Sequence, residues 1–197
     1  MGAWSGIVRH LGKSGWQVIV GARDEGRAEA AVESLKKDGA DIMGWQYVNL
    51  SDNKEIESSA KGIANAYPTL SLLINNAGIP GDMAVRSYEQ SLQDVIDTVQ
   101  VNYIGTFLLT KLLLPVLEKN HGRICNITVP SSFSPFWHPM AYVASKAGQN
   151  TMVSTMAWEF EHFNVPVEIF DIHPGATSTD LNGHYSGPGS HMPSTIG

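Results

Sequence analysis

A tyrosine and a lysine stand four residues apart in the segment AYVASK, at Tyr142 and Lys146. In a helix, this spacing brings the phenol and the ammonium group to the same face. A neighbouring positive charge favours the phenolate and lowers the pKa of a tyrosine, as a general acid working near neutral pH requires. Ordinary surface pairs share this spacing, so the pair becomes a candidate for proton transfer only through the motifs around it.

Two further motifs place amides where a ligand could meet the backbone. The segment NNAG, at residues 75–78, directly follows the apolar run SLLI. Its small residues allow a close backbone approach and its amides can tie neighbouring strands, although Asn and Gly also favour ordinary turns. Asn102 lies within an apolar helical stretch, where an amide needs a hydrogen-bond partner.

A Pro-Gly turn follows the apolar run VEIFDI, at Pro174 and Gly175, with hydroxyls after it at Thr177 and Thr179. Such a turn can hold an amide-bearing ligand or simply reverse the chain. His138 and His173 are given no role, because histidines in loops and at strand ends are mostly structural or solvated.

The opening residues resemble a glycine-rich turn that holds phosphate at a helix start. Gly2 and Gly6 precede an apolar helix-like run and then the strand QVIVG. No strand-forming residues precede Gly2, and a third glycine is missing where the helix should start. The sequence therefore predicts a phosphate site that is only partly present.

Short apolar runs alternate with longer helical patterns along the chain. The runs VIV and SLLIN are apolar on both faces, which is typical of parallel strands covered by helices. The alternation predicts a doubly wound α/β sheet with ligands at the carboxyl ends of its strands. The expected strands are 17–21, 44–49, 70–75, 123–128 and 165–172, and the expected helices are 24–38, 52–67, 91–119 and 141–163.

Length and charge limit the classes of protein. A chain of 197 residues predicts one domain over 1–197, with 183–197 as a loop-like tail rich in Gly, Pro and Ser. The formal net charge is −6 and no Lys/Arg cluster is visible, so nucleic acid is not an expected partner.

The single cysteine, Cys125, has no disulfide partner and no metal-ligand companions, which favours a cytoplasmic protein without a metal site. The longest apolar run, 104–117, contains Lys111 and Pro115, and we expect these to break it too early for a membrane span.

Taken together and in this order, NNAG, VNYIG, YVASK and PGATST resemble the short-chain dehydrogenase/reductase family over about residues 1–183. The resemblance implies a Rossmann-type seven-stranded parallel sheet. It also implies hydride transfer between NAD(P)(H) and a small-molecule carbonyl or alcohol. A flavodoxin-like module without enzymatic activity would fit the alternation but not YVASK with PGATST.

The resemblance assigns roles to residues that match the family motifs. Tyr142 would be the general acid, Lys146 would lower its pKa and hold the nicotinamide ribose, and Asn102 would anchor a water relay to that lysine. The cofactor-binding set would comprise Gly2, Gly6, Asn49, Leu50, Asn76, Ala77, Gly78, Pro174, Gly175, Thr177 and Thr179, together with Tyr142 and Lys146.

Arg23 bears on the choice of cofactor. It follows the second strand of the family pattern, where NAD-binding members usually carry an acid for the ribose 2′-hydroxyl. An arginine suits a 2′-phosphate instead, so NADP is favoured over NAD.

The sequence also departs from the family pattern. Val129 stands where the catalytic serine is expected, and a valine cannot hydrogen-bond a substrate carbonyl. Ser131 is the candidate replacement, because period 2 puts it on the same face as Val129. The first and the last strand of the family sheet are also missing.

Two hypotheses therefore stay open. The chain is an NADP-dependent carbonyl reductase, or a truncated or degenerate relative that acts as a binding or oligomerisation module. The apolar helices around Asn102 and after Tyr142 are where the family dimerises, which favours a homo-oligomer.

Overall fold

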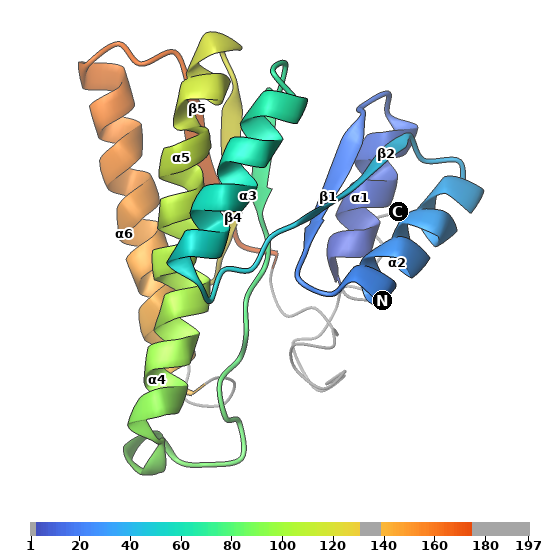
Figure 1. The fold of residues 1–197 in the computed structure, drawn as a ribbon. Helices are drawn as coiled ribbons and strands as arrows, with labels where there is room; N and C mark the ends of the chain where they lie inside the picture. The colour runs from blue at the N-terminus through green and yellow to red at the C-terminus, as the bar shows by residue number, and fades with distance from the viewer. Residues whose placement is uncertain (1–2, 131–138, 175–197) are drawn as a thin grey trace. The chain divides into compact units, whose positions relative to one another are not determined.

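The computed structural model describes residues 3–130 and 139–174, and their elements alternate between helix and strand (Figure 1). These residues divide into two compact units, with the boundary in the chain between Asn49 and Leu50, and each unit is described by itself.

The first unit contains a two-stranded parallel sheet and two helices. The helices are α1 (Ala3–Lys13) and α2 (Glu25–Lys37), and the strands are β1 (Val18–Ala22) and β2 (Ile42–Tyr47). Asp24 caps α2 by accepting a hydrogen bond from the backbone of Arg27. The core is apolar and comprises Val20, Val32, Leu35, Ala40 and Ile42, with Trp4, Val8, Val18 and Trp45 packed against it.

The second unit contains a parallel sheet in the order β3-β4-β5. Its strands are β3 (Leu72–Asn75), β4 (Arg123–Ile127) and β5 (Glu168–Ile172), and its helical segments are α3 (Asn53–Ala66), η1 (Ser87–Glu89), α4 (Leu92–Val99), η2 (Gln100–Gly105), α5 (Thr106–Lys119) and α6 (Met140–His162). Helices α3, α5 and α6 lie on the same side of this sheet (Figure 1). Leu113, Leu117 and Ile124 are fully buried in the resulting core.

Within the described residues, no strand pairs with both β1 and β3, so the parallel strands form two sheets. The sequence predicts a doubly wound sheet that lacks the strand which the family places between them, and the division into two sheets is consistent with that missing strand. The α/β class and the five predicted strands are confirmed, although their ends differ from the predicted ones. The largest difference is in the last strand, which begins at Glu168 rather than at Val165.

The helical stretch from Leu92 to Lys119 differs from the expectation. Lys111 and Pro115 do not break it, since α5 continues through both residues. The stretch is long and apolar enough to cross a membrane, with a mean hydropathy of 1.3. This is weak evidence for a span, because core helices of soluble proteins meet the same criterion, and Leu109, Leu113 and Leu117 are buried here.

Within that stretch, η2 is a π-helical segment. Such segments are rare and occur frequently at functional sites. Gly105 ends it where the chain passes close to the loop that precedes α3, because a Cβ at this position would collide with the backbone oxygen of Leu50. The absence of a side chain at Gly105 therefore allows η2 to approach that loop.

Candidate active site

Tyr142 and Lys146 lie one turn apart near the start of α6, as their spacing predicts. Each is only 3% exposed, and the Nζ atom of Lys146 lies 5.9 Å from the centroid of the Tyr142 ring. The two side chains therefore share one buried environment.

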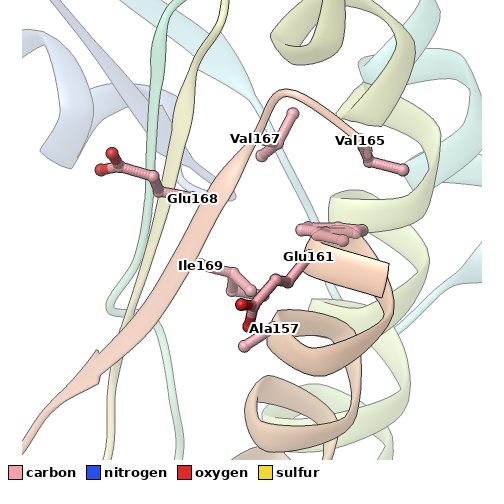
Figure 2. Close-up of a pocket in the computed structure, with 7 residues that line it drawn as sticks. Ala157, Glu161, Val165, Val167, Glu168 and Ile169 are labelled. Atoms are coloured by element: carbon pink, nitrogen blue, oxygen red, sulfur yellow. The ribbon is translucent and has the colours of Figure 1, made fainter. Parts of the chain in front are cut away.

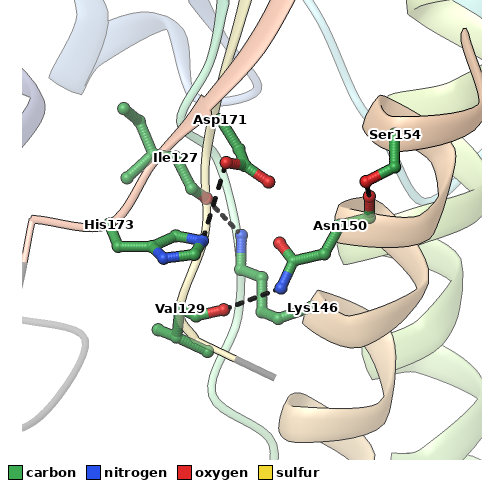
Figure 3. A network of polar contacts seen from close by, with 7 residues as sticks. All are labelled: Ile127, Val129, Lys146, Asn150, Ser154, Asp171 and His173. Carbon is green, nitrogen blue, oxygen red and sulfur yellow. Dashed lines mark hydrogen bonds and ion pairs between the residues drawn. The ribbon is translucent and has the colours of Figure 1, made fainter. Parts of the chain in front are cut away.

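Lys146 is held by two oxygen atoms, one at the end of β4 and one on α6. Its Nζ donates to the backbone oxygen of Ile127 at 2.9 Å (Figure 3). It also donates to Oε1 of Gln149 at 2.9 Å. Burial lowers the pKa of Lys146 from 10.5 to about 8, because the ammonium is the form that loses hydration. Gln149 carries no family signal, although its position three residues after Lys146 puts it on the same helix face.

Tyr142 corrects one sequence-based expectation. The neighbouring ammonium was expected to lower its pKa, but burial raises the pKa of Tyr142 from 10 to about 12. Desolvation of the phenolate therefore outweighs the attraction of Lys146 at this separation. Tyr142 holds its proton at neutral pH, which is the form that a proton donor needs.

Asn102 is fully buried on η2 and joins two segments distant in sequence. Its Nδ2 donates to the Ile79 oxygen at 2.9 Å and to Ser145 Oγ at 3.1 Å, and its Oδ1 accepts from the Ile79 backbone N–H at 2.8 Å. Ser145 Oγ in turn donates to the backbone oxygen of Tyr142 at 2.7 Å. Asn102 therefore fixes the loop after β3 against the start of α6, through Ser145 rather than through a direct bond to Lys146.

Gly78 lies in that loop, beside the two side chains. A Cβ at this position would lie 3.1 Å from Asn102 Oδ1 and 3.7 Å from Lys146 Nζ. Asn76 is half-buried and Ala77 exposed in the same loop. The NNAG motif thus brings bare backbone next to the lysine ammonium, as its small residues predict.

Asn75 ties the strands beneath the site. Its Nδ2 donates to Thr110 Oγ1 on α5 at 2.9 Å and to Asn126 Oδ1 on β4 at 2.7 Å. Asn126 itself is fully buried, and its Nδ2 has no hydrogen-bond partner in the described part of the chain. Sequence reasoning missed Thr110 and Asn126, because neither partner is near Asn75 in the sequence.

The segment after β4 is described up to Pro130, so Ser131 lies outside the described residues. Val129 is half-buried, and its backbone oxygen accepts a 2.9 Å hydrogen bond from Asn150 Nδ2 on α6. Among the described residues, the buried Thr128 Oγ1 and Gln149 Nε2 have no hydrogen-bond partner. These two atoms can therefore still form hydrogen bonds with a ligand near the end of β4.

The remaining candidate cofactor residues fall in both units. Arg23 is exposed after β1, Asn49 is half-buried at the end of the first unit, and Leu50 is buried at the start of the second. Pro174 is exposed after β5, whereas Gly2, Gly175, Thr177 and Thr179 lie outside the described residues. Gly6 differs from the expectation: it lies inside α1 rather than in a turn, because helical structure already begins at Ala3.

A cleft of about 280 Å³ lies elsewhere, between the end of α6 and the start of β5 (Figure 2). Phe160 and Val167 line it, with Glu161 and Glu168 beside them. It lies at the amino end of β5, whereas Lys146 bonds Ile127, which pairs with Ile172 at the carboxyl end. The cleft is therefore separate from the tyrosine–lysine pair. No group of His, Cys, Asp and Glu that could hold a metal ion occurs in residues 3–130 and 139–174.

Comparison with known proteins gives the geometry its context. The family described as short chain dehydrogenase matches residues 2–187. A short-chain dehydrogenase/reductase of Armillaria gallica is 28% identical, over 89% of this chain and 62% of that protein. The 3-oxoacyl-[acyl-carrier-protein] reductase FabG of Staphylococcus aureus is 32% identical, over 89% of this chain and 70% of its own length.

Solved structures agree. A single-substitution variant of actinorhodin polyketide ketoreductase with NADPH superposes with a TM-score of 0.81 and 28% identity, covering 92% of this chain and 69% of that one. A short-chain dehydrogenase/reductase from Burkholderia phymatum in complex with NAD shares the fold with a TM-score of 0.81 and 19% identity, covering 93% of this chain and 65% of that one.

The chain spans less than two thirds of the length of the Armillaria relative. Its buried tyrosine–lysine pair lies beside the parallel strand ends of an α/β sheet. With the family match over residues 2–187, these findings establish that the chain belongs to the short-chain dehydrogenase/reductase family of oxidoreductases.

Proposed function

We propose that this protein is an NADP-dependent oxidoreductase that reduces the carbonyl group of an aldehyde or ketone, with Tyr142 as the general acid. The observation that carries the proposal is the buried pair itself: a protonated phenol with an ammonium 5.9 Å from its ring centroid. Relatives that reduce 3-oxoacyl groups make a 3-oxoacyl thioester the first substrate class to test.

The residues around Lys146 fit a nicotinamide cofactor. The bare backbone of Gly78 lies where a Cβ would approach both Lys146 and Asn102, so a ligand can come close to the ammonium there. The buried Thr128 Oγ1 and Gln149 Nε2 lack partners within the described residues and offer further hydrogen bonds. Lys146, Asn76, Ala77 and Gly78 would hold the cofactor in this unit, with Pro174, Gly175, Thr177 and Thr179 following β5.

A reduced nicotinamide supplies a hydride to the carbonyl carbon when it is bound. Tyr142 gives its phenolic proton to the carbonyl oxygen, so that carbonyl, hydride and proton together make an alcohol. The phenolate that this leaves is stabilised by the charge of Lys146. Asn102 and Ser145 keep the start of α6 in place during this transfer, because Asn102 bonds to Ser145 and Ser145 bonds to the backbone of Tyr142.

Arg23 supports NADP over NAD, because it is an exposed cation directly after β1. A guanidinium makes charge-assisted hydrogen bonds with a 2′-phosphate, whereas a 2′-hydroxyl carries no negative charge to pair with it. By the family pattern, Asn49 and Leu50 would lie beside the adenine, and Gly2 would belong to the turn that meets the pyrophosphate.

The alternative function is a binding or oligomerisation module without activity. Val129 in place of a serine and the helical position of Gly6 favour this reading. We further propose that the protein is cytoplasmic and consists of a single domain. We also propose that it forms a homo-oligomer, because Leu92, Ile96 and Phe107 on α4 and α5 are exposed apolar residues of the kind that a second copy covers.

Titration of the purified chain with NADPH, and in parallel with NADH, separates these two functions. Thermal stability should increase with NADPH concentration and less with NADH, because a ligand that binds only the folded state stabilises it by mass action. A folded chain that responds to neither nucleotide contradicts the enzymatic proposal.

The role of Tyr142 is tested by Tyr142→Phe. We expect the variant to lose NADPH-dependent reduction of acetoacetyl-CoA or of a simple ketone while it keeps its NADPH-induced thermal shift. Tyr88→Phe is the matched control, because Tyr88 is 78% exposed on η1 and should leave the rate unchanged. Retained turnover in Tyr142→Phe would refute the assigned role.

A further inference from the structure

Gln149 meets the lysine of the buried pair from within the same helix. It follows Lys146 by three residues on α6, so the two side chains lie on one helix face. Gln149 is fully buried, and its Oε1 accepts a hydrogen bond from the Lys146 ammonium at 2.9 Å. The other acceptor is the backbone oxygen of Ile127 on β4 (Figure 3). The ammonium is therefore held between one acceptor on the helix and one on the strand.

The chemistry of the two groups explains why the amide oxygen faces the lysine. An ammonium can only donate hydrogen bonds, so an amide meets it with Oε1 and turns Nε2 away. Nε2 has no hydrogen-bond partner among the described residues, although burying such a group costs free energy. A position that served packing alone would favour an apolar side chain. Within the described residues, the side chain of Gln149 makes one hydrogen bond, and it is the bond to Lys146.

The next residue, Asn150, attaches the helix to the strand end. Its Nδ2 donates to the backbone oxygen of Val129 at 2.9 Å (Figure 3). This bond joins α6 directly to the segment after β4, whereas Gln149 reaches that segment only through the ammonium. The attachment of α6 to the end of β4 therefore does not depend on Gln149 alone.

A neutral acceptor stabilises the charged form of a buried lysine. Burial lowers the pKa of Lys146 to about 8, and a hydrogen bond that the ammonium donates acts in the opposite direction. Loss of one hydrogen bond to a charged group should lower the pKa by about one pH unit. The Nζ atom lies 5.9 Å from the centroid of the Tyr142 ring, so its charge acts on the phenolate that proton transfer leaves.

We propose that Gln149 is a positioning residue for the reaction, which holds the ammonium of Lys146 in its charged form beside Tyr142. The inference rests on the proposed reductase function. In this role Gln149 acts through Lys146 and touches neither the substrate nor the cofactor. Lys146 donates two of its three N–H groups to Ile127 and Gln149, which leaves the third for a bound cofactor.

The first test follows the titration of Lys146 through the stability of the protein. Because its pKa is lower in the folded state than in the unfolded chain, the free energy of unfolding rises with pH above the folded-state value. In urea unfolding, this rise should begin near pH 8 in the wild type and about one pH unit lower in Gln149→Met. In Gln149→Glu it should begin at a higher pH, since a carboxylate favours the neighbouring ammonium more strongly than an amide does.

A matched control and the unchanged surroundings assign the shift to Lys146. Gln93→Met makes the same substitution at an exposed glutamine of α4 and should follow the wild type. Every other titratable group is the same in wild type and Gln149→Met, so the difference between these proteins reports on Lys146. On the elements packed around it, these groups include Tyr142 on α6, Cys125 on β4, Tyr103 on η2, Asp94 and Asp97 on α4, and Asp171 and His173 in and directly after β5.

The second test measures kcat for the NADPH-dependent reduction of acetoacetyl-CoA between pH 6 and 9. With the pKa of Lys146 one pH unit lower, kcat of Gln149→Met should be about 3-fold below that of the wild type at pH 7.5 and close to it at pH 6. A purely structural defect would instead lower kcat by the same factor at every pH.

Two results would overturn the inference. One is a rise in stability that begins at the same pH in wild type, Gln149→Met and Gln149→Glu, and the other is a loss of kcat that is equal at every pH. If Gln149→Met does not fold, Gln149→Glu keeps the shape and the acceptor and must still move the rise to higher pH. The expected stability shifts in a chain without NADPH-dependent reduction would contradict the reductase function and leave the hold of Gln149 on Lys146 standing.

Discussion

Replacing Lys146 by methionine removes a buried charge and should change how the stability of the protein depends on pH. Burial lowers the pKa of Lys146 from 10.5 to about 8. At 1.36 kcal/mol for each pKa unit, this difference corresponds to a penalty of about 3 kcal/mol while the lysine is charged in both states. The penalty is fully present below pH 8.

The direction of the effect follows from proton binding. Between pH 8 and 10.5 the folded protein releases the Lys146 proton before the unfolded chain does. The unfolded state then binds more protons, so the free energy of unfolding rises with pH. For these two pKa values, the wild type should gain about 2 kcal/mol between about pH 7 and pH 9.5 that Lys146→Met does not gain.

Comparing the two proteins at several pH values isolates this group. Methionine leaves Ile127 O and Gln149 Oε1 without their donor, which costs about 1–3 kcal/mol at every pH and cancels from the slope. Other titrating groups, including Tyr142 and Cys125, cancel in the same way.

Urea unfolding of both proteins, followed by circular dichroism at about 222 nm from pH 7 to 9.5, gives the required free energies. Lys61→Met, which removes an exposed lysine of α3, should follow the wild type in parallel. A wild-type-minus-Lys146→Met difference that stays constant within about 0.5 kcal/mol over this range would refute a lowered pKa for Lys146.

Two further predictions concern packing. Gly105→Ala should lower the free energy of unfolding by about 2 kcal/mol or more in urea, because its Cβ would collide with Leu50; Gly62→Ala, with no atom within 4 Å, should instead raise it by about 0.5–1 kcal/mol. Burial raises the pKa of Cys125 to about 11, so the native chain should not react with a thiol reagent at pH 8. After unfolding, one equivalent of thiol per chain should react. Rapid labelling of the native chain would contradict the burial of Cys125.

The sequence alone determined the order of strands and helices, the spacing of Tyr142 and Lys146, and the loop position of NNAG. These features are local: an apolar run of two-sided strand residues, an i,i+4 spacing and a small-residue turn are each readable within a few residues. The sequence also showed that the first strand of the family pattern is missing, whereas the division of the strands into two sheets was seen only in the structure.

The tertiary structure decided the chemistry of those residues. Whether a neighbouring ammonium lowers the pKa of Tyr142 depends on how much water burial removes, and burial proved the larger effect. The partners of Asn102 and Asn75 come from segments distant in the sequence, and Ile172 lies opposite Ile127 only through the pairing of β4 with β5. Desolvation and strand pairing join distant parts of the chain, and a spacing within one segment carries no information about either.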